Sequence, residues 1–242
     1  KKSEQLANNI RKHAVIMTSL GNSSHIGSIL SIADILAVLY GSVLKYDSKD
    51  PKWKDRASFI LSKGHAGGGV YAALAESGFM PLEKLKTHFQ DGSDLSGHVS
   101  HKGIPGVEFS TGSLGHGLPI AVGMAIAAKI TKSKHKVIVV TGDGEMNEGS
   151  NWEAAMTASK HKLSNLTLII DYNKIQSYGY TKDVLDLEPL EKKLNSFGLA
   201  CKDVDGHNVE NLKKIFKKLP FNSKKPSVII CHTINGKGIT YA

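Results

Sequence analysis

A glycine-flanked aspartate stands at the end of one of the most apolar segments of the chain. Asp143 lies within the sequence Thr-Gly-Asp-Gly-Glu at 141–145, directly after the apolar residues 137–140. Such a run predicts a buried strand of a parallel sheet, and ligands of these sheets bind beyond the carboxyl ends of the strands. Gly144 would let backbone N–H groups approach an anion. Taken alone, however, Gly-Asp-Gly is more often a simple turn.

A second polar strand end gives this aspartate a partner. Asn173 follows the apolar run 166–170 and Asp171, about 30 residues after Asp143, a distance that fits one helix and one strand. Asp143 and Asn173 are therefore expected side by side at one edge of the sheet. Carboxylate, amide and backbone carbonyl oxygens suit Mg²⁺, which often completes its shell with water and substrate phosphates. The pair predicts a magnesium-bridged diphosphate.

The hydrophobic pattern predicts the elements that position these residues. Helices are expected over Ser3–Ser19, Ser31–Leu39, Gly68–Glu76, Leu82–Thr87, Gly117–Ile130, Asn151–His161, Leu187–Ser196 and Val209–Leu219. Strands are expected over Ser58–Leu61, Val137–Thr141, Leu166–Asp171, Leu199–Val204 and Ser227–Thr233. This alternation indicates an α/β fold, a parallel β-sheet flanked by helices. Because no segment resembles a linker, we expect a single domain over residues 1–242.

The motifs around the two strand ends resemble the N-terminal, thiamine-diphosphate-binding part of transketolase. Gly142–Gly144 followed by Asn173 is similar to the thiamine-diphosphate signature. Further blocks occur in the order of the family, namely Ser24–His25, Leu61–Ala66, Gly97–His98, Pro105–Glu108 and Thr111–Gly115. The resemblance extends from about Gly21 to Gly238 and implies the thiamine-diphosphate-binding fold.

The resemblance implies a role for each matched residue. The divalent metal, Mg²⁺ or another cation such as Ca²⁺ or Mn²⁺, would be held by Asp143, the Asn173 side chain and the Ile175 carbonyl. The cofactor contacts would be His65, Gly144 and Asn173 at the diphosphate and Gly112, Ser113 and Leu114 at the aminopyrimidine. The catalytic residues would be His25, His65, His98 and Glu148. Among these, His25 and His98 would bind substrate hydroxyls, and Glu148 would lie at the subunit interface.

Several of these residues have competing interpretations. His101 competes with His98, which is favoured because it follows Gly97 as in the family. Glu145 and Glu148 could simply stabilise a helix N-terminus. The remaining histidines without a motif are expected at the surface, namely His13, His88, His135, His161 and His207.

Four positions depart from the transketolase pattern. Ile26 stands where Pro is common, His116 replaces a usual Gln, Ser177 replaces an apolar residue that often touches the cofactor ring, and Asn235 stands where Lys is common. These changes bear on sugar specificity more than on the cofactor.

Composition excludes several other classes of protein. The 242 residues are 40% hydrophobic and 22% charged, which is typical of a globular chain. No apolar run approaches the ~18 residues of a membrane span, and no signal peptide is evident. Cys201 and Cys231 form no CxxC motif, which fits a reducing cytoplasm. The net charge is +9. A nucleic-acid-binding surface is not favoured, because such surfaces interleave aromatic residues with the basic ones and the lysines here show no such interleaving.

The sequence ends soon after Gly236–Gly238, whereas a full transketolase continues into pyrimidine-binding and C-terminal domains. We therefore expect the diphosphate-binding subunit of a two-chain transketolase, active only with a second subunit that carries those domains, in an α₂β₂ assembly. It would transfer a two-carbon ketol unit between a ketose and an aldose, both expected to be phosphorylated. The alternatives are a subunit of another thiamine-diphosphate enzyme, of deoxyxylulose-phosphate synthase or 2-oxoacid dehydrogenase E1 type, and a non-catalytic partner that retains the fold.

Overall fold

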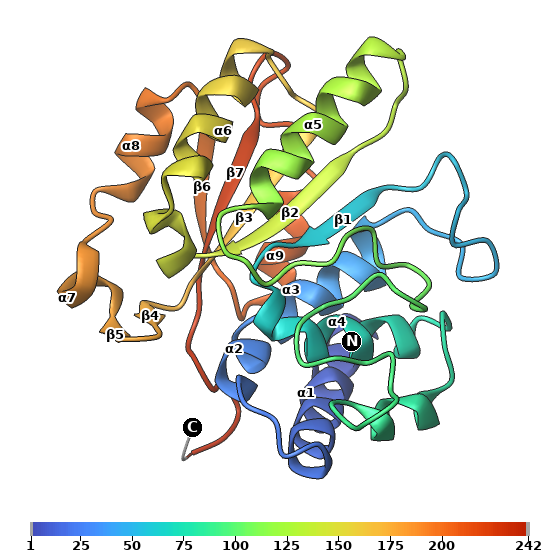
Figure 1. Cartoon of the computed structure of the whole chain (residues 1–242). Helices are drawn as coiled ribbons and strands as arrows, with labels where there is room; N and C mark the ends of the chain where they lie inside the picture. Colours follow the sequence, from blue (N-terminus) through green and yellow to red (C-terminus); the bar gives the residue numbers. More distant parts are fainter. Residues whose placement is uncertain (1, 241–242) are drawn as a thin grey trace.

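A five-stranded sheet lies between two layers of helices (Figure 1). The computed structural model describes residues 2–240. The strands lie in the order β1 (Ser58–Leu61), β2 (Val137–Gly142), β3 (Leu166–Tyr172), β7 (Ser227–His232) and β6 (Ala200–Asp205), and every neighbouring pair is parallel. The predicted α/β class is therefore confirmed.

The apolar runs of the central strands cover both faces of the sheet. Ile138 and Val140 of β2 pack into one core, whereas Val137 and Val139 pack into the other. This division follows from the strand geometry, because successive side chains point to opposite faces. A strand that is buried on both faces is mainly apolar, which is why the runs 137–140 and 168–170 show no polar alternation.

Each face of the sheet is covered by its own set of helices (Figure 1). One layer contains α1 (Lys2–Leu20), α2 (Ile26–Ser31), α3 (Ala33–Val38), α4 (Gly67–Glu76) and α9 (Val209–Phe216). The other contains α5 (Gly117–Ile130), α6 (Gly149–Lys160) and α8 (Leu190–Ser196). Among the described residues 2–240, no helix is both long and apolar enough to cross a membrane.

Two helix predictions were wrong in detail. The helix expected over Ser31–Leu39 is interrupted at Ile32, and a π-helical turn (Leu39–Val43) follows α3. At the interruption, the Ser31 hydroxyl lies 2.6 Å from a carboxylate oxygen of Asp171, a contact into the core that fixes the end of α2. The segment Leu82–Thr87 is a 3₁₀ helix, and only Leu85 in it is buried, so it lacks the apolar face that stabilises an α-helix.

Three short elements beyond β3 were not predicted. A hairpin of β4 (Ile175–Gln176) and β5 (Gly179–Tyr180) leads into α7 (Thr181–Leu185). These elements are too short to show a hydrophobic period, and most of their side chains are exposed. They nevertheless form one wall of the cavity described below.

A buried ion-pair cluster anchors the segment after β7 to the first helices. Asp34 on α3 is 6% exposed and accepts hydrogen bonds from the Arg11 guanidinium of α1 and from Nδ1 of His207. Arg11 Nε also donates to the Lys237 carbonyl, and His207 Nε2 accepts from the Ile234 N–H at 2.9 Å. The cluster therefore fixes the backbone on both sides of Asn235.

Burial acts to raise the pKa of Asp34, but the hydrogen bonds from His207 and Arg11 outweigh it and hold this pKa below its usual value. The ionised carboxylate therefore stabilises the fold at neutral pH. This contribution is lost as the pH falls through the lowered pKa of the folded state.

We predict that Asp34→Asn lowers the free energy of unfolding by about 2–4 kcal/mol at pH 7, because the amide lacks the charge that pairs with Arg11 and turns an NH₂ group toward the Arg11 or His207 donors. Urea denaturation checks this value, and the difference from the wild type should shrink in acid. The matched control is Asp203→Asn, since the exposed Asp203 pairs with the exposed His232 and its loss should change stability by less than about 1 kcal/mol. An equal effect of the two substitutions would contradict the prediction.

Candidate functional site

The two polar strand ends lie against each other, as the sequence predicts. β2 and β3 are neighbours, and Gly142 pairs with Asp171 at their carboxyl ends. The Asp143 N–H donates to the Asp171 carbonyl at 3.1 Å. The Lys174 N–H donates to Asp143 Oδ2 at 2.7 Å. Asp143 therefore contacts the backbone on both sides of Asn173.

Asp143 is a buried carboxylate, and no cationic side chain among the described residues donates a hydrogen bond to it. It is 1% exposed and accepts hydrogen bonds from the Gly144 N–H (2.9 Å), the Lys174 N–H (2.7 Å) and the Thr181 hydroxyl (3.2 Å). Burial raises its pKa to about 6, and the Gly144 N–H opposes this shift. A nearby cation would favour the ionised form.

The oxygens at the strand ends retain capacity for a hard cation. A carboxylate offers about four lone-pair sites, and an amide oxygen offers two. Three hydrogen bonds use lone pairs of the Asp143 carboxylate, and one, from the Ile175 N–H, uses a lone pair of Asn173 Oδ1. Within residues 2–240, no three His, Cys, Asp or Glu side chains are arranged to hold a metal. A cation here would need water or ligand oxygens to complete its shell, which suits Mg²⁺ beside a diphosphate.

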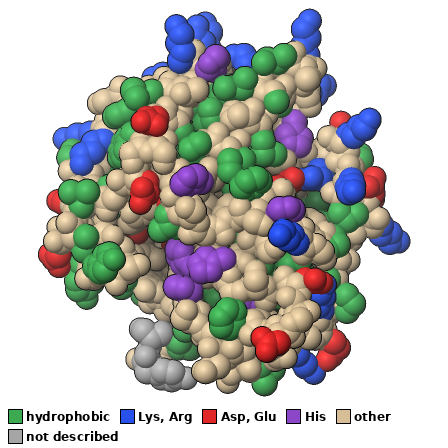
Figure 2. Space-filling view, in the orientation of Figure 1, with side chains coloured by type: hydrophobic (Ala, Val, Ile, Leu, Met, Phe, Trp, Pro, Cys, Tyr) green, Lys and Arg blue, Asp and Glu red, His purple; other side chains and the backbone are tan. Residues whose placement is uncertain are grey.

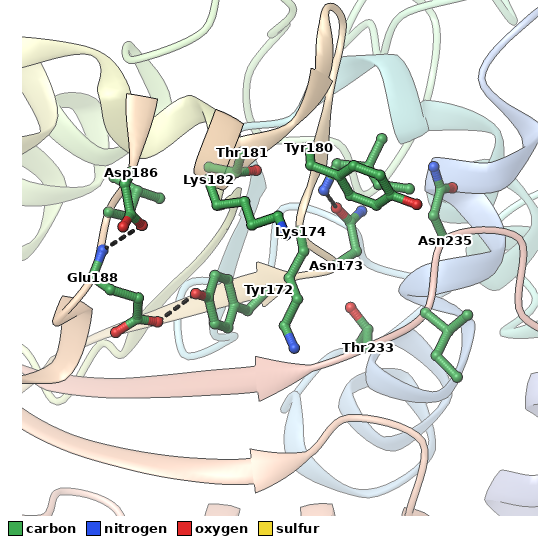
Figure 3. A pocket seen from close by; sticks show the side chains of 13 residues that line it. Tyr172, Asn173, Lys174, Tyr180, Thr181, Lys182, Asp186, Glu188, Thr233 and Asn235 are labelled. Carbon is green, nitrogen blue, oxygen red and sulfur yellow. Dashed lines mark hydrogen bonds between the residues drawn. The ribbon is translucent and has the colours of Figure 1, made fainter. Parts of the chain in front are cut away.

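A cavity of about 790 Å³ opens beside Asn173. Asn173 and Tyr180 line it from the β3–β5 side, and Asn235 lies across from them on the segment after β7 (Figure 3). The Asn235 Oδ1 atom is buried and has no hydrogen-bond partner within residues 2–240. It lies so close to Gly27 that a Cβ added to Gly27 would be 2.1 Å from it. Asn235, which departs from the family pattern, therefore belongs to the wall of this cavity.

The other three residues that depart from the transketolase pattern lie on different elements. Ile26 begins α2 next to His25, and Ser177 is exposed in the turn between β4 and β5. His116 is exposed at the start of α5, with its Nδ1 atom 3.1 Å from the Leu114 carbonyl.

Three histidines from distant segments gather at one place on the surface. The ring centroids of His25 and His65 are 5.2 Å apart, those of His25 and His98 are 5.7 Å apart, and those of His65 and His98 are 6.5 Å apart. Figure 2 shows histidine side chains gathered near the middle of the viewed face, with Lys and Arg mainly at the periphery. His101 instead lies beside Ser110, so His98 is the one that joins the cluster.

The backbone and charge state of this cluster are unusual. His25 has φ +72°, a left-handed conformation that non-glycine residues rarely adopt. Burial, followed by the Lys63 ammonium, lowers the pKa of His65 to about 3, and desolvation and His98 also lower the pKa of His25. His65 is therefore neutral at physiological pH and can donate one N–H to an anion or a hydroxyl.

A buried ion pair connects the histidine cluster to the strand ends. Lys63, 1% exposed, donates to Oδ2 of the fully buried Asp171, and the Asn173 amide donates to the same oxygen at 3.2 Å. This contact fixes which end of the Asn173 amide carries the oxygen. The pair was not predicted, because a lysine in a Ser-Lys-Gly-His segment gives no local sign of burial.

The glycine loop and Glu148 border the same region. A Cβ on Gly112 would lie 2.7 Å from the His98 ring, so the Gly112–Leu114 loop runs directly against the cluster. Glu148 is exposed just before α6, and its side chain makes no capping hydrogen bond. Glu148 nevertheless stands at the N-cap position of α6, where its negative charge is consistent with the alternative interpretation, stabilisation of a helix N-terminus.

The histidines predicted at the surface are not all exposed. His88 is 2% exposed, which contradicts the prediction, and its Nδ1 atom has no hydrogen-bond partner in the part of the chain that the structure describes. His13 pairs with Glu76, and His207 belongs to the Asp34 cluster. A histidine side chain has enough apolar surface to be buried when a tertiary partner is present, and local sequence does not reveal that partner.

Comparison with known proteins identifies the family. The model described as "Transketolase, thiamine diphosphate binding domain" matches residues 2–241. The chain belongs to the transketolase family. The transketolase from Leishmania mexicana has a solved structure that matches with a TM-score of 0.93 at 34% identity, over 99% of this chain and 38% of that longer one. The resemblance read from the sequence and the expected thiamine-diphosphate-binding fold are both confirmed.

Relatives of similar length are separate transketolase subunits. An apulose-4-phosphate transketolase subunit of Actinobacillus succinogenes is 46% identical over 240 residues, which cover 98% of this chain and 86% of that protein. A 6-deoxy-6-sulfo-D-fructose transketolase subunit of a Clostridium species is 40% identical over 236 residues, with the same coverage. These names favour a transketolase subunit over one from another thiamine-diphosphate enzyme.

We predict that the His65 imidazole does not titrate between about pH 5 and pH 8, because its pKa is about 3. The ring Cε1–H resonance, followed by NMR in the labelled chain and assigned with His65→Gln, should keep the chemical shift of a neutral imidazole. A titration midpoint within this range would show that Lys63 and burial do not control the charge of His65.

Proposed function

We propose that this chain is the cofactor-binding subunit of a two-chain transketolase that moves a two-carbon ketol unit from a ketose to an aldose. The contact of the Asp143 and Asn173 strand ends beside the histidine cluster carries this proposal. The family match over residues 2–241 supports it. When bound, thiamine diphosphate supplies the nucleophilic carbon and the electron sink of the transfer.

The proposed metal site uses the Asp143 carboxylate, the Asn173 amide oxygen and the Ile175 carbonyl. Their remaining lone pairs suit Mg²⁺, or Ca²⁺ or Mn²⁺, with water and diphosphate oxygens filling the other positions. The raised pKa of Asp143 supports this assignment, because a cation there would stabilise a carboxylate that burial destabilises. Gly144, at the end of β2, would present its backbone to the diphosphate.

The histidines have complementary proposed roles. His65, which is neutral and follows the buried Lys63 by two residues, would donate an N–H to the diphosphate. His25 and His98, both exposed, would bind substrate hydroxyls and stabilise charge that develops on a substrate oxygen. The backbone of Gly112, Ser113 and Leu114 would contact the aminopyrimidine ring. The position of Gly112 against the His98 ring is consistent with this role.

The active assembly is proposed to need a second subunit with the pyrimidine-binding and C-terminal domains. The exposed Glu148 would face this partner, and an α₂β₂ heterotetramer follows by analogy with symmetric thiamine enzymes. The substrates would be sugar phosphates; one relative is named for a sugar phosphate and another for a sulfo sugar. The free Cys201 and Cys231 support a cytoplasmic location.

Reconstitution tests this function. The chain, mixed with its cognate second subunit, thiamine diphosphate and Mg²⁺, is expected to transfer the ketol unit from a ketose phosphate to an aldose phosphate, followed by chromatography of the sugar products. Product formation that requires pyruvate would instead indicate a deoxyxylulose-phosphate synthase or dehydrogenase subunit. An assembled complex that binds no cofactor by calorimetry would indicate a non-catalytic partner.

Two substitutions separate the metal site from the substrate site. Asp143→Ala should lower Mg²⁺-dependent affinity for thiamine diphosphate by at least about 100-fold, because the diphosphate loses its bridge to the protein. His25→Ala should leave that affinity within about threefold and lower kcat by roughly 10²–10⁴-fold. Calorimetry of the assembled complex measures the first effect and ketol transfer the second. Unchanged affinity in Asp143→Ala would remove this residue from the metal site.

A further inference from the structure

We infer that Glu145 is a positioning residue of the cofactor site, whose carboxylate holds together the three loops that carry the proposed cofactor contacts. This inference rests on the proposed function. Glu145 lies in the 3₁₀ segment Gly144–Asn147 and is 2% exposed, so it is placed to act on neighbouring protein groups rather than on a ligand.

The Glu145 carboxylate accepts a hydrogen bond from each of the three loops. Oε1 accepts from the Ser62 hydroxyl (2.5 Å) and from the Gly115 N–H (2.9 Å), and Oε2 accepts from the Gly142 N–H (3.1 Å). Ser62 leads into the loop that carries His65. Gly115 ends the loop over Gly112–Leu114, and Gly142 directly precedes Asp143. One side chain thus joins segments that are far apart in the sequence.

A second set of hydrogen bonds connects Glu145 to the helices α5 and α6. The Ser62 oxygen accepts from the Gly117 N–H at 3.0 Å, so this hydroxyl links the start of α5 to Glu145. The Asn151 amide donates to the Glu145 carbonyl at 2.7 Å and ties its backbone to α6. A Cβ on Gly117 would lie 2.3 Å from the Ser62 oxygen, which shows how closely these segments pack.

These contacts argue against a role in stabilising a helix N-terminus, which the sequence left open. The donors to the carboxylate come from Ser62, Gly115 and Gly142, none of which lies in the first turn of α6. A carboxylate can accept from all three donors at once. In glutamine one of the two carboxylate oxygens is replaced by an NH₂ group. In one amide orientation this NH₂ group would face the Gly142 N–H, and in the other it would face the Ser62 and Gly115 donors. Either way two donors would meet at a buried position without room for water.

The test compares Glu145→Gln with the wild type in the complex with the second subunit. Affinity for thiamine diphosphate, titrated by calorimetry at saturating Mg²⁺, should fall about 10–100-fold, the usual effect of removing a group that orients ligand contacts. At saturating cofactor, kcat should change less than about threefold, because Glu145 touches neither cofactor nor substrate. The matched control Glu191→Gln, on the exposed face of α8, should change neither value.

A second readout follows the loops without the cofactor. In Glu145→Gln, hydrogen exchange should be faster at the Gly115 and Gly142 amides than in the wild type, while the amides of β7 keep their protection. Ser62→Ala should show the same pattern with a smaller effect and serves as the test if Glu145→Gln does not fold. A double-mutant cycle between the two should be non-additive, because they share one hydrogen bond.

The outcomes separate this inference from the proposed function. A wild-type complex that binds cofactor, with Glu145→Gln binding it equally well, would overturn the positioning role alone. A lower melting temperature with unchanged cofactor affinity would show a merely structural role and would also overturn it. A wild-type complex that binds no thiamine diphosphate would overturn the proposed function, and the positioning role with it.

Discussion

The parallel pairing of β2 with β3 is the constraint on which the whole candidate site depends. Its register sets Gly142 opposite Asp171, so the residues that follow each strand leave the sheet at the same level. The hydrogen bond from the Lys174 N–H to Asp143 then holds the two strand ends together. A shift of this register by one residue would turn every side chain of one strand to the opposite face of the sheet. Asp143 and Asn173 would then no longer lie close enough to share a cation.

The distribution of buried charge favours a cation at these strand ends. Asp143, Glu145 and Asp171 are each 2% exposed or less. Lys63 pairs with Asp171, whereas Asp143 and Glu145 are held by neutral N–H and O–H donors. Burial raises the pKa of both Asp143 and Glu145, so the ionised form of each is costly here and a nearby cation would stabilise it. Burial lowers the pKa of the nearby His65 to about 3, so this imidazole is neutral at physiological pH and can donate an N–H without being protonated.

The comparisons place these features in a chain that corresponds to one part of larger enzymes. It spans 86% of the apulose-4-phosphate transketolase subunit from Actinobacillus succinogenes but 38% of the solved transketolase from Leishmania mexicana. The strand ends, the histidine cluster and the Glu145 network all lie within the matched part. The matched part therefore contains the residues proposed for the metal and the diphosphate.

The sequence alone determined the five strands of the main sheet, their α/β arrangement and the meeting of the Asp143 and Asn173 strand ends. Apolar runs and connection lengths are local properties of the chain, and they are enough to indicate a parallel sheet. The choice of His98 over His101 came from the family motif and not from periodicity, and the ring contacts of His98 with His25 and His65 agree with it. The sequence offered no sign of the Lys63–Asp171 pair, the burial of His88, or the contacts of Glu145. These features depend on which distant segments pack together, and burial of a polar side chain is decided only by the partner that the tertiary structure brings to it.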